Sequence, residues 1–136
     1  MSDWKIIRAL LVADANLTAV VAAEKIVAGT LKQTTTLPAI SIQSISSMEN
    51  EKISDKSSTV MMTSRVQVTV HATSLTQQAA VLALVGRAIR GGRRVVAGVQ
   101  VLDIQRDIIG PDMSDVASSI FQQTRDFRVK YLFSLE

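Results

Sequence analysis

The segment from Val60 to Ala72 alternates apolar and polar residues, and it is the clearest element in the sequence. The apolar residues that share one side are Met62, Val66, Val68, Val70 and Ala72. This period of two predicts a long β-strand, because successive side chains of a strand point to opposite faces of the sheet. One face of the sheet is therefore predicted to be buried and the other solvated, which is typical of antiparallel sheets.

Two helices are expected to cover the buried face. The first begins at Ser2 or Asp3, either of which can cap a helix, and its apolar stripe consists of Trp4, Ile7, Leu10 and Leu11. A short turn capped by Asn16 follows it. The other helix is predicted from Ser74 or Thr76 to Arg90, where two glycines end it. Its expected inward residues are Ala79, Leu82, Val85, Ala88 and Ile89.

The other strands are less regular. We expect a brief strand at Lys25 to Ala28 and a longer one at Ala39 to Ser46, with a bulge near Gln43 and Ser44. The polar stretch from Met48 to Thr59 is predicted to be a solvated excursion. Two long β segments, Val95 to Ile108 and Val116 to Leu135, finish the chain on either side of a Gly-Pro-Asp turn.

These elements predict an α+β fold with a mainly antiparallel sheet and two helices on one face. The chain has 136 residues, of which 47% are hydrophobic, so residues 1–136 are expected to form a single domain. No basic leader precedes an apolar run, and no apolar run approaches the roughly 20 residues of a membrane-spanning helix. We therefore expect no membrane partner.

Catalytic and metal-binding chemistry finds little support in the residues. Cysteine is absent and there is one histidine, which excludes thiol nucleophiles and multi-histidine metal sites. His71 falls on the solvated side of its strand without a catalytic context, and Asp103 and Asp107 are too far apart along a strand to form a carboxylate pair. The glycines near residue 90 end a helix, whereas a phosphate loop starts one. We predict a protein that is not an enzyme and that holds no cofactor or metal.

The positive charge of the sequence is concentrated in one corner. Lysine and arginine number 15 and acidic residues 12, and four of the basic residues are Arg87, Arg90, Arg93 and Arg94. Without these four, the chain carries 11 positive and 12 negative charges. A nucleic-acid binder would be expected to carry a stripe of positive charge over a whole face. The corner has two readings, a complement to the negative end of a helix or an electrostatic contact with an acidic neighbour subunit or with DNA.

A counterpart for this corner is predicted in the polar stretch, whose acidic residues include Glu49, Glu51 and Asp55. The long apolar strand from Phe121 to Phe133 would be an aggregation hazard at a sheet edge, and pairing with a second copy would remove the hazard. Phe127 and Tyr131 are the residues of this strand that we expect at such a contact. A head-to-tail contact of this kind joins two different surfaces of one subunit and can close into a ring.

The succession of elements resembles the tail completion, or tail terminator, proteins of long-tailed bacteriophages. The resemblance covers nearly the whole chain in order and size, and its motifs are individually weak. They are the segment Asp14 to Val21, the Leu-Pro-Ala-Ile entry at 37–40, the strand ending in His-Ala-Thr at 71–73, a helix after Ser74, and the Thr-Arg-Asp-Phe-Arg-Val strand at 124–129.

The resemblance implies a homo-oligomeric ring, usually of six copies, that caps the tail tube and ends its polymerisation. Such a ring presents a surface to the neck of the DNA-filled head, and genomic DNA passes through it without sequence-specific contact. The resemblance implies no catalytic residues in this sequence, because the family has none. Its lumen tends to be acidic, so the basic corner is expected at a subunit or neck interface. The implied location is the head-proximal end of the virion tail, after assembly in the host cytoplasm. A head–tail connector or a tail-tube subunit is the alternative.

Overall fold

The computed structural model describes residues 2–52, 59–115 and 117–134. Its helices are α1 (Asp3–Ala13), α2 (Ala15–Thr18), a short 3-10 helix η1 (Ala23–Lys25) and α3 (Leu75–Ala88). Its strands are β1 (Ile26–Ala28), β2 (Ala39–Lys52), β3 (Thr59–Ala72), β4 (Arg94–Val96), β5 (Val99–Ile109) and β6 (Phe121–Ser134).

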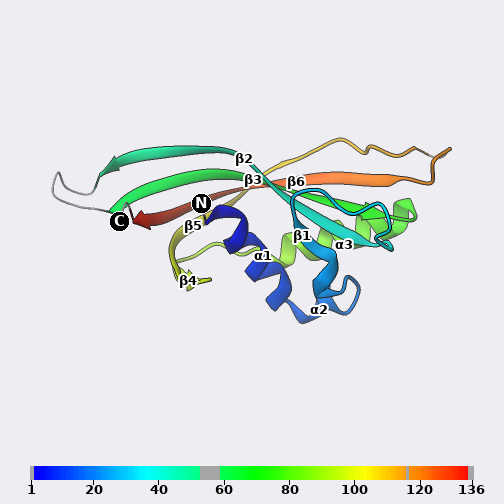
Figure 1. The fold of residues 1–136 in the computed structure, drawn as a ribbon, viewed down its shortest axis with the longest axis horizontal. Helices are drawn as coiled ribbons and strands as arrows, with labels where there is room; N and C mark the ends of the chain where they lie inside the picture. The colour runs from blue at the N-terminus through cyan, green and yellow to red at the C-terminus, as the bar shows by residue number, and fades with distance from the viewer. Residues whose placement is uncertain (1, 53–58, 116, 135–136) are drawn as a thin grey trace.

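The strands form one six-stranded sheet with the spatial order β1-β2-β3-β6-β5-β4. Every neighbouring pair is antiparallel except β1 and β2, which are parallel. The helices lie on one side of this sheet (Figure 1). The α+β prediction, with a mainly antiparallel sheet covered on one face, is therefore confirmed.

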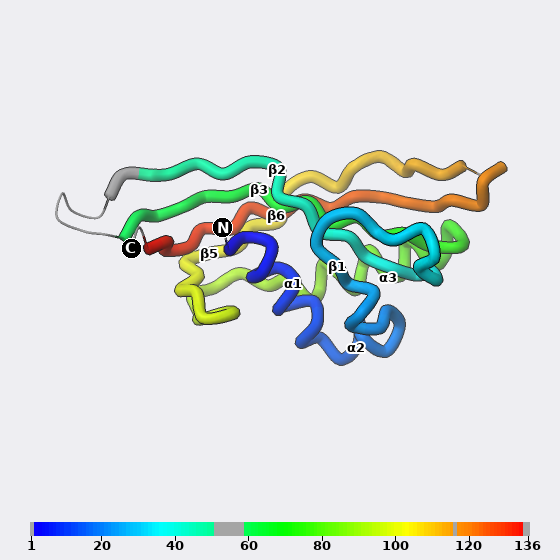
Figure 2. The backbone as a smooth tube through the Cα atoms, viewed as in Figure 1, coloured from blue at the N-terminus to red at the C-terminus, as the bar shows by residue number. Residues whose placement is uncertain are grey.

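The core fills the space between the sheet and the helices. Strand β3 alternates buried and partly exposed residues from end to end, and the predicted apolar positions of this strand are the buried ones. From the helices, Ile6, Ile7 and Leu11 of α1 and Val81, Leu82 and Val85 of α3 are buried with them. In the backbone view, one end of β2 and β3 extends beyond the helices (Figure 2), although Val60 and Met62 at that end of β3 are still buried.

Two helix details differ from the sequence prediction. Helix α2 is capped by Asp14, whose carboxylate accepts a hydrogen bond from the N–H of Leu17 at 2.9 Å, so the prediction of Asn16 as the cap was wrong. Helix α3 begins after Ser74 as predicted, and the Ser74 hydroxyl accepts from the N–H of Gln77. Ala79 of α3, however, is exposed, and Gln78 is buried beside it because its amide donates to Asp112 and Gln123.

Strand β2 continues to Lys52, so the beginning of the predicted solvated excursion is instead a strand that pairs with β3. The rest of that excursion, residues 53–58, lies outside the described residues. The bulge was predicted in nearly the right place, because the register between β2 and β3 shifts between Ser44 and Ser46. The segment predicted as one strand from Val95 is divided into β4 and β5 by a turn at Ala97 and Gly98, which both have positive φ.

Strand β6 is the largest topological correction. It pairs with β3 along its whole length, from Phe121 opposite Ala72 to Ser134 opposite Thr59, and with β5 on its other side. It is therefore internal to the sheet, and the prediction of an exposed edge at Phe121 to Phe133 was wrong. The long strands with open edges are β2 and β5, because the three-residue strands β1 and β4 cover only part of each.

Candidate assembly interface

The basic corner lies where α3 ends and the chain returns to the sheet. The guanidinium of Arg90 donates to the carbonyl of Arg87 at 3.3 Å, and the guanidinium of Arg94 donates to the carbonyl of Arg90. Arg90 therefore satisfies a carbonyl in the last turn of α3, whereas the carbonyl that Arg94 reaches lies beyond the helix. Hydrogen bonds within the subunit account for two of the four arginines.

Arg87 and Arg93 have a different environment. Both are exposed, and neither side chain has a hydrogen-bond or ion-pair partner among residues 2–52, 59–115 and 117–134. Arg87 lies in the last turn of α3, where its charge is favourable to the helix dipole, but no hydrogen bond of the helix end engages either side chain. They are available to a neighbouring molecule.

Two further arginines, which the sequence analysis did not single out, bring positive charge to the same place. Arg106 of β5 donates to the carbonyl of Gly86 at 2.8 Å, and the guanidinium of Arg125 of β6 lies against the same glycine. Burial and the nearby charge of Arg106 lower the pKa of Arg125. No local sequence pattern could place Arg106 and Arg125 beside the basic corner, because the pairing of β5 with β6 and the packing of α3 bring them there.

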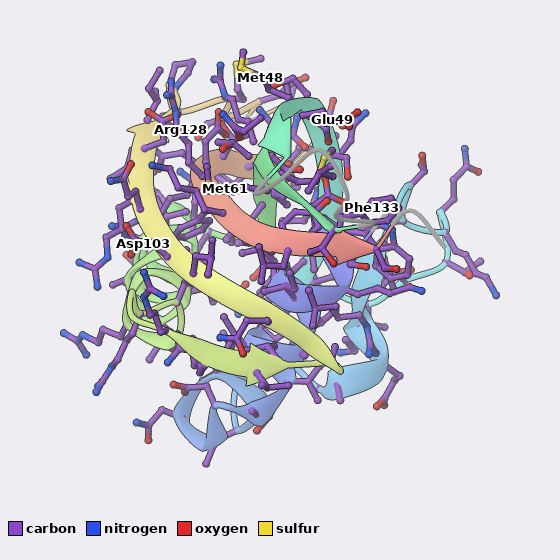
Figure 3. All side chains as sticks on the ribbon, turned by 90° about the vertical axis from the view of Figure 1, so that its left-hand side faces the viewer. Met48, Glu49, Met61, Asp103, Arg128 and Phe133 are labelled. Carbon is purple, nitrogen blue, oxygen red and sulfur yellow. The ribbon has the colours of Figure 1, made fainter. Side chains whose placement is uncertain are left out.

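The predicted acidic counterpart is only partly within the described residues. Glu49 is exposed on β2. Glu51 lies in the same strand, and Asp55 falls outside the described residues. Glu49 and the basic corner are on strands near opposite margins of the sheet, since β2 and β4 are separated by β3, β6 and β5. In Figure 3, which looks along the strands, Glu49 and Asp103 likewise lie on different sides of β6.

The structure does not support Phe127 and Tyr131 as exposed interface residues. Both have no exposed surface and lie in the core, because the alternation of β6 turns these positions toward the helices. The Tyr131 hydroxyl lies 3.4 Å from the Ser64 hydroxyl, and burial raises the pKa of this phenol. We place these two rings in the subunit's own core.

The face of the sheet away from the helices carries an ion-pair network. Arg65 of β3 contacts the buried carboxylate of Asp126 at 2.5 Å, and Arg128 of β6 contacts the partly exposed carboxylate of Asp107 at 3.0 Å. Arg65 also lies 4.0 Å from Asp107 and links the two pairs. Asp103 accepts a hydrogen bond from the N–H of Ile104 at 2.9 Å. Asp107 is therefore held in ion pairs with arginines, whereas Asp103 accepts a backbone hydrogen bond from its own strand.

His71 lines an open hollow of about 500 Å³ between the sheet and the chain around residues 29–37. Its Nε2 is 3.0 Å from the Ser41 hydroxyl, a contact that sequence analysis missed because it crosses between strands. Burial lowers the pKa of His71, although a hydrogen bond with Gln122 opposes the shift. A serine nucleophile also needs its histidine oriented by a third group. No carboxylate hydrogen-bonds His71 in the part of the chain that the structure describes.

Metal and membrane features were searched in the same described ranges. They contain no group of three or more histidine or acidic residues arranged to hold a metal ion. None of their helices has the length and apolar character needed to span a bilayer.

A family model described as tail completion protein gp17 matches residues 5–114. The chain belongs to this family. It is therefore a structural protein of a phage-type tail, and the resemblance noted in the sequence is confirmed. No curated protein matches the sequence significantly.

The fold has a counterpart among solved structures. A chain from the virion of a native gene transfer agent particle superimposes with a TM-score of 0.72, over 96% of this chain and 94% of that chain. The sequence identity is 13%, so the similarity concerns the fold. A member of the tail completion family thus shares nearly its whole fold with a virion component of a gene transfer agent.

Proposed function

We propose that this tail completion protein caps the tail tube as a ring, ends tube polymerisation and forms the tail side of the head–tail joint. The match to the tail completion family over residues 5–114 is the observation that carries the proposal. The near-complete fold similarity to a chain from the virion of a gene transfer agent supports it. The ring sits at the head-proximal end of the virion tail, after assembly in the host cytoplasm.

The proposed ring needs two different surfaces on each subunit, because head-to-tail contacts close by rotation. The open margins of the sheet and the separation of Glu49 from the basic corner supply two such surfaces. Six copies is the expected number, with the tail-tube protein on one side and the neck on the other. The protein has no catalytic role in this proposal, and passing DNA makes no sequence-specific contact with it.

Mass measurement on the purified protein, alone and mixed with tail tubes, tests this function. The ring should have a mass close to six times the subunit's 14.7 kDa. Electron micrographs of the mixture should show one added disc at a single end of each tube, with no further growth. A protein that remains monomeric both alone and on tubes would contradict the ring.

The same measurement, extended to growing tail tubes and to emptied heads, separates the two alternatives. Incorporation along the whole length of growing tubes would identify a tail-tube subunit. Binding to emptied heads without binding to tubes would identify a connector of the neck. Either result would replace the capping function.

A further inference from the structure

The two margins of the sheet present open strand edges to solvent. Strand β1 pairs with β2 only at Ile40–Ile42, and β4 pairs with β5 only at Val99–Val101. Within the described residues, no backbone hydrogen bond reaches the outer edge of β2 beyond residue 42 or that of β5 beyond residue 101. Gly91 lies beside the Ile104 carbonyl, so the uncovered part of the β5 edge begins at Gln105. The open edges at residues 43–52 of β2 and 105–109 of β5 are templates for pairing with another chain.

The directions of the two edges suit each other. Strands β2, β3, β6 and β5 follow one another in the sheet by three antiparallel steps, so β2 runs opposite to β5. Two copies in the same orientation, placed side by side, therefore bring β5 of one copy and β2 of the next into antiparallel register. This is the arrangement of an ordinary antiparallel ladder.

The two edges also match in their position along the strands. Ser46 pairs with Arg65, Arg65 with Arg128, and Arg128 with Gln105, which forms one continuous row from β2 to β5. The row needs no displacement along the strands to continue from Gln105 of one copy to Ser46 of the next. In a closed ring whose axis runs parallel to the strands, rotation produces side-by-side copies without such a displacement.

A second row places opposite charges at its two ends. Glu49 pairs with Met62, Met62 with Tyr131, Tyr131 with Val101, and Val101 with Arg94. Residues that pair across strands share a face of the sheet, so Glu49 and Arg94 lie at the two ends of a row whose middle is core. In the side-by-side arrangement, β2 approaches the first residue of the neighbour's β4, and Glu49 meets the basic corner there.

Apolar side chains are exposed on the same two strands. Ile45 and Met48 of β2 are 44% and 67% exposed, and Ile108 and Ile109 of β5 are 55% and 50% exposed. Between Ala39 and Asn50, the only charged residue of β2 is Glu49. Residues 43–48 of β2 can therefore pair with the β5 edge of a neighbouring copy without burying a charge of β2. Glu49 comes next, and there the arginines of the neighbouring copy lie beyond the open part of its β5.

We propose that the subunits join edge to edge, with β2 of one copy hydrogen-bonded antiparallel to β5 of the next and with Glu49 against Arg93 and Arg94. The partner is a second copy of this chain. The inference rests on the proposed ring and specifies its contact. It makes the sheets of all the copies one continuous structure around the ring.

Engineered cysteines test the contact directly, because the sequence contains no cysteine. Ser46→Cys and Gln105→Cys are combined in one chain, since both residues are exposed and paired with the same face of the sheet. Within one subunit these positions are three strand spacings apart, about 14 Å. A disulfide requires Cα atoms within about 7 Å, so a bond between these positions joins two subunits.

Mild oxidation of the double variant should give a ladder of covalent multimers up to the full ring on a non-reducing gel. Each single variant should remain uncrosslinked, and so should Ser46→Cys combined with Ala83→Cys on the exposed side of α3. A double variant that assembles into rings but does not crosslink would overturn the edge-to-edge contact and leave the ring intact. A wild-type protein that forms no ring, alone or on tubes, would overturn both.

Charge reversal tests the other half of the contact. Glu49→Arg should lower the assembled fraction at least tenfold, and Arg93→Glu should do the same, while both variants keep the wild-type melting temperature. The double variant Glu49→Arg with Arg93→Glu should recover most of the assembly. Two single losses that the double variant does not repair would show that Glu49 does not face this corner.

Discussion

Arg65 and Arg128 make ion pairs on the same face of the sheet, but their partners differ in burial. Asp126, the partner of Arg65, is buried. Asp107, the partner of Arg128, is partly exposed, and Arg128 itself is mostly exposed to solvent. Arg65→Met should therefore lower the free energy of unfolding by about 2 kcal/mol, because it leaves a buried carboxylate without its charged hydrogen-bond donor. Urea unfolding monitored by circular dichroism measures the loss.

Arg128→Met is the matched control for that prediction. Its guanidinium is 56% exposed, so solvent screens the pair with Asp107 and the expected loss is below about 1 kcal/mol. Equal losses in the two variants would mean that the burial of Asp126 does not decide the strength of these pairs.

The histidine should make stability depend on pH. Burial lowers the pKa of His71 from its ordinary value of 6.5, so the folded protein binds a proton less readily than the unfolded chain. The free energy of unfolding should accordingly be highest above pH 6.5 and fall as the pH drops below it. In urea titrations between pH 7.5 and 5.5, His71→Gln should flatten this dependence.

Ser41→Ala serves as the comparison, since it removes a hydrogen-bond partner of His71 but keeps the titrating imidazole. It should lower stability at every pH and retain the slope. A His71→Gln profile parallel to that of the wild type would assign the slope to other groups.

Some single residues were predictable and others were not. The buried positions of β3 followed from alternation, because each side chain's face depends only on its place in the strand. The choice of Asp14 over Asn16 as a cap depends on where α2 begins, and both residues are good caps. Gln78 could not be predicted as buried, because its partners Asp112 and Gln123 come from a distant part of the chain.

At the scale of elements, α3 is held to the sheet by its apolar side. Leu82 is 7% exposed and belongs to the core cluster. Leu82→Ala should lower the free energy of unfolding by about 2–5 kcal/mol through lost burial and the cavity that remains. Leu75→Ala, at a residue that is 54% exposed, should change it by less than about 0.5 kcal/mol. Denaturant unfolding that gives the two variants equal losses would contradict this packing.

The turn between β4 and β5 offers a stabilising substitution. Ala97 and Gly98 have φ values of 50° and 77°, as in the two-residue hairpin turns that favour Asn-Gly. Ala97→Asn should raise the free energy of unfolding by up to about 1 kcal/mol, because asparagine tolerates positive φ better than alanine. Gly98→Ala should lower it by about 1–2 kcal/mol for the converse reason. Thermal unfolding of both variants checks the opposite signs.

The elements that sequence analysis misjudged are those whose limits depend on pairing. Strand β2 continues through polar residues such as Ser47 and Asn50 because β3 supplies a hydrogen-bonding partner along its length. The location of β6 inside the sheet reflects strand order, which local periodicity does not encode. The helix before Gly91, by contrast, carries its own start and stop signals.

At the scale of the whole molecule, the strand order determines which surface the basic corner can face in a neighbouring copy. The sequence already indicated an arginine cluster and acidic residues elsewhere, but not that Glu49 and Arg94 end the same row of the sheet. Such a row is a property of five paired strands. Assembly surfaces of this kind are therefore visible only when the complete topology is known, whereas the absence of a catalytic motif was apparent from the sequence.

The charge of the basic corner should control how strongly the subunits assemble. Arg87→Gln combined with Arg93→Gln removes the two arginines that have no partner among the described residues. This variant should fold with wild-type stability but assemble more weakly. The wild-type assembly should loosen between about 0.1 M and 1 M salt, as the Debye length falls from about 10 Å to 3 Å. Light scattering or native mass measurement follows both effects. Arg90→Gln is the matched control, and it should instead lower stability by about 0.3–1 kcal/mol, because this side chain donates to the carbonyl of Arg87 in the last turn of α3.

Duplex DNA distinguishes the interface from a nucleic-acid site. Apart from the four-arginine corner, the chain carries one more negative than positive charge, and this excess repels a polyanion. The free subunit should therefore leave duplex DNA unretarded in a gel at physiological salt, even though its corner is basic. A nucleic-acid binder would instead retard DNA at low salt and lose binding steeply as salt rises, because each phosphate contact releases counterions. Strong retardation by the wild type that disappears in the Arg87 and Arg93 variant would assign the corner to DNA and remove it from the subunit contact.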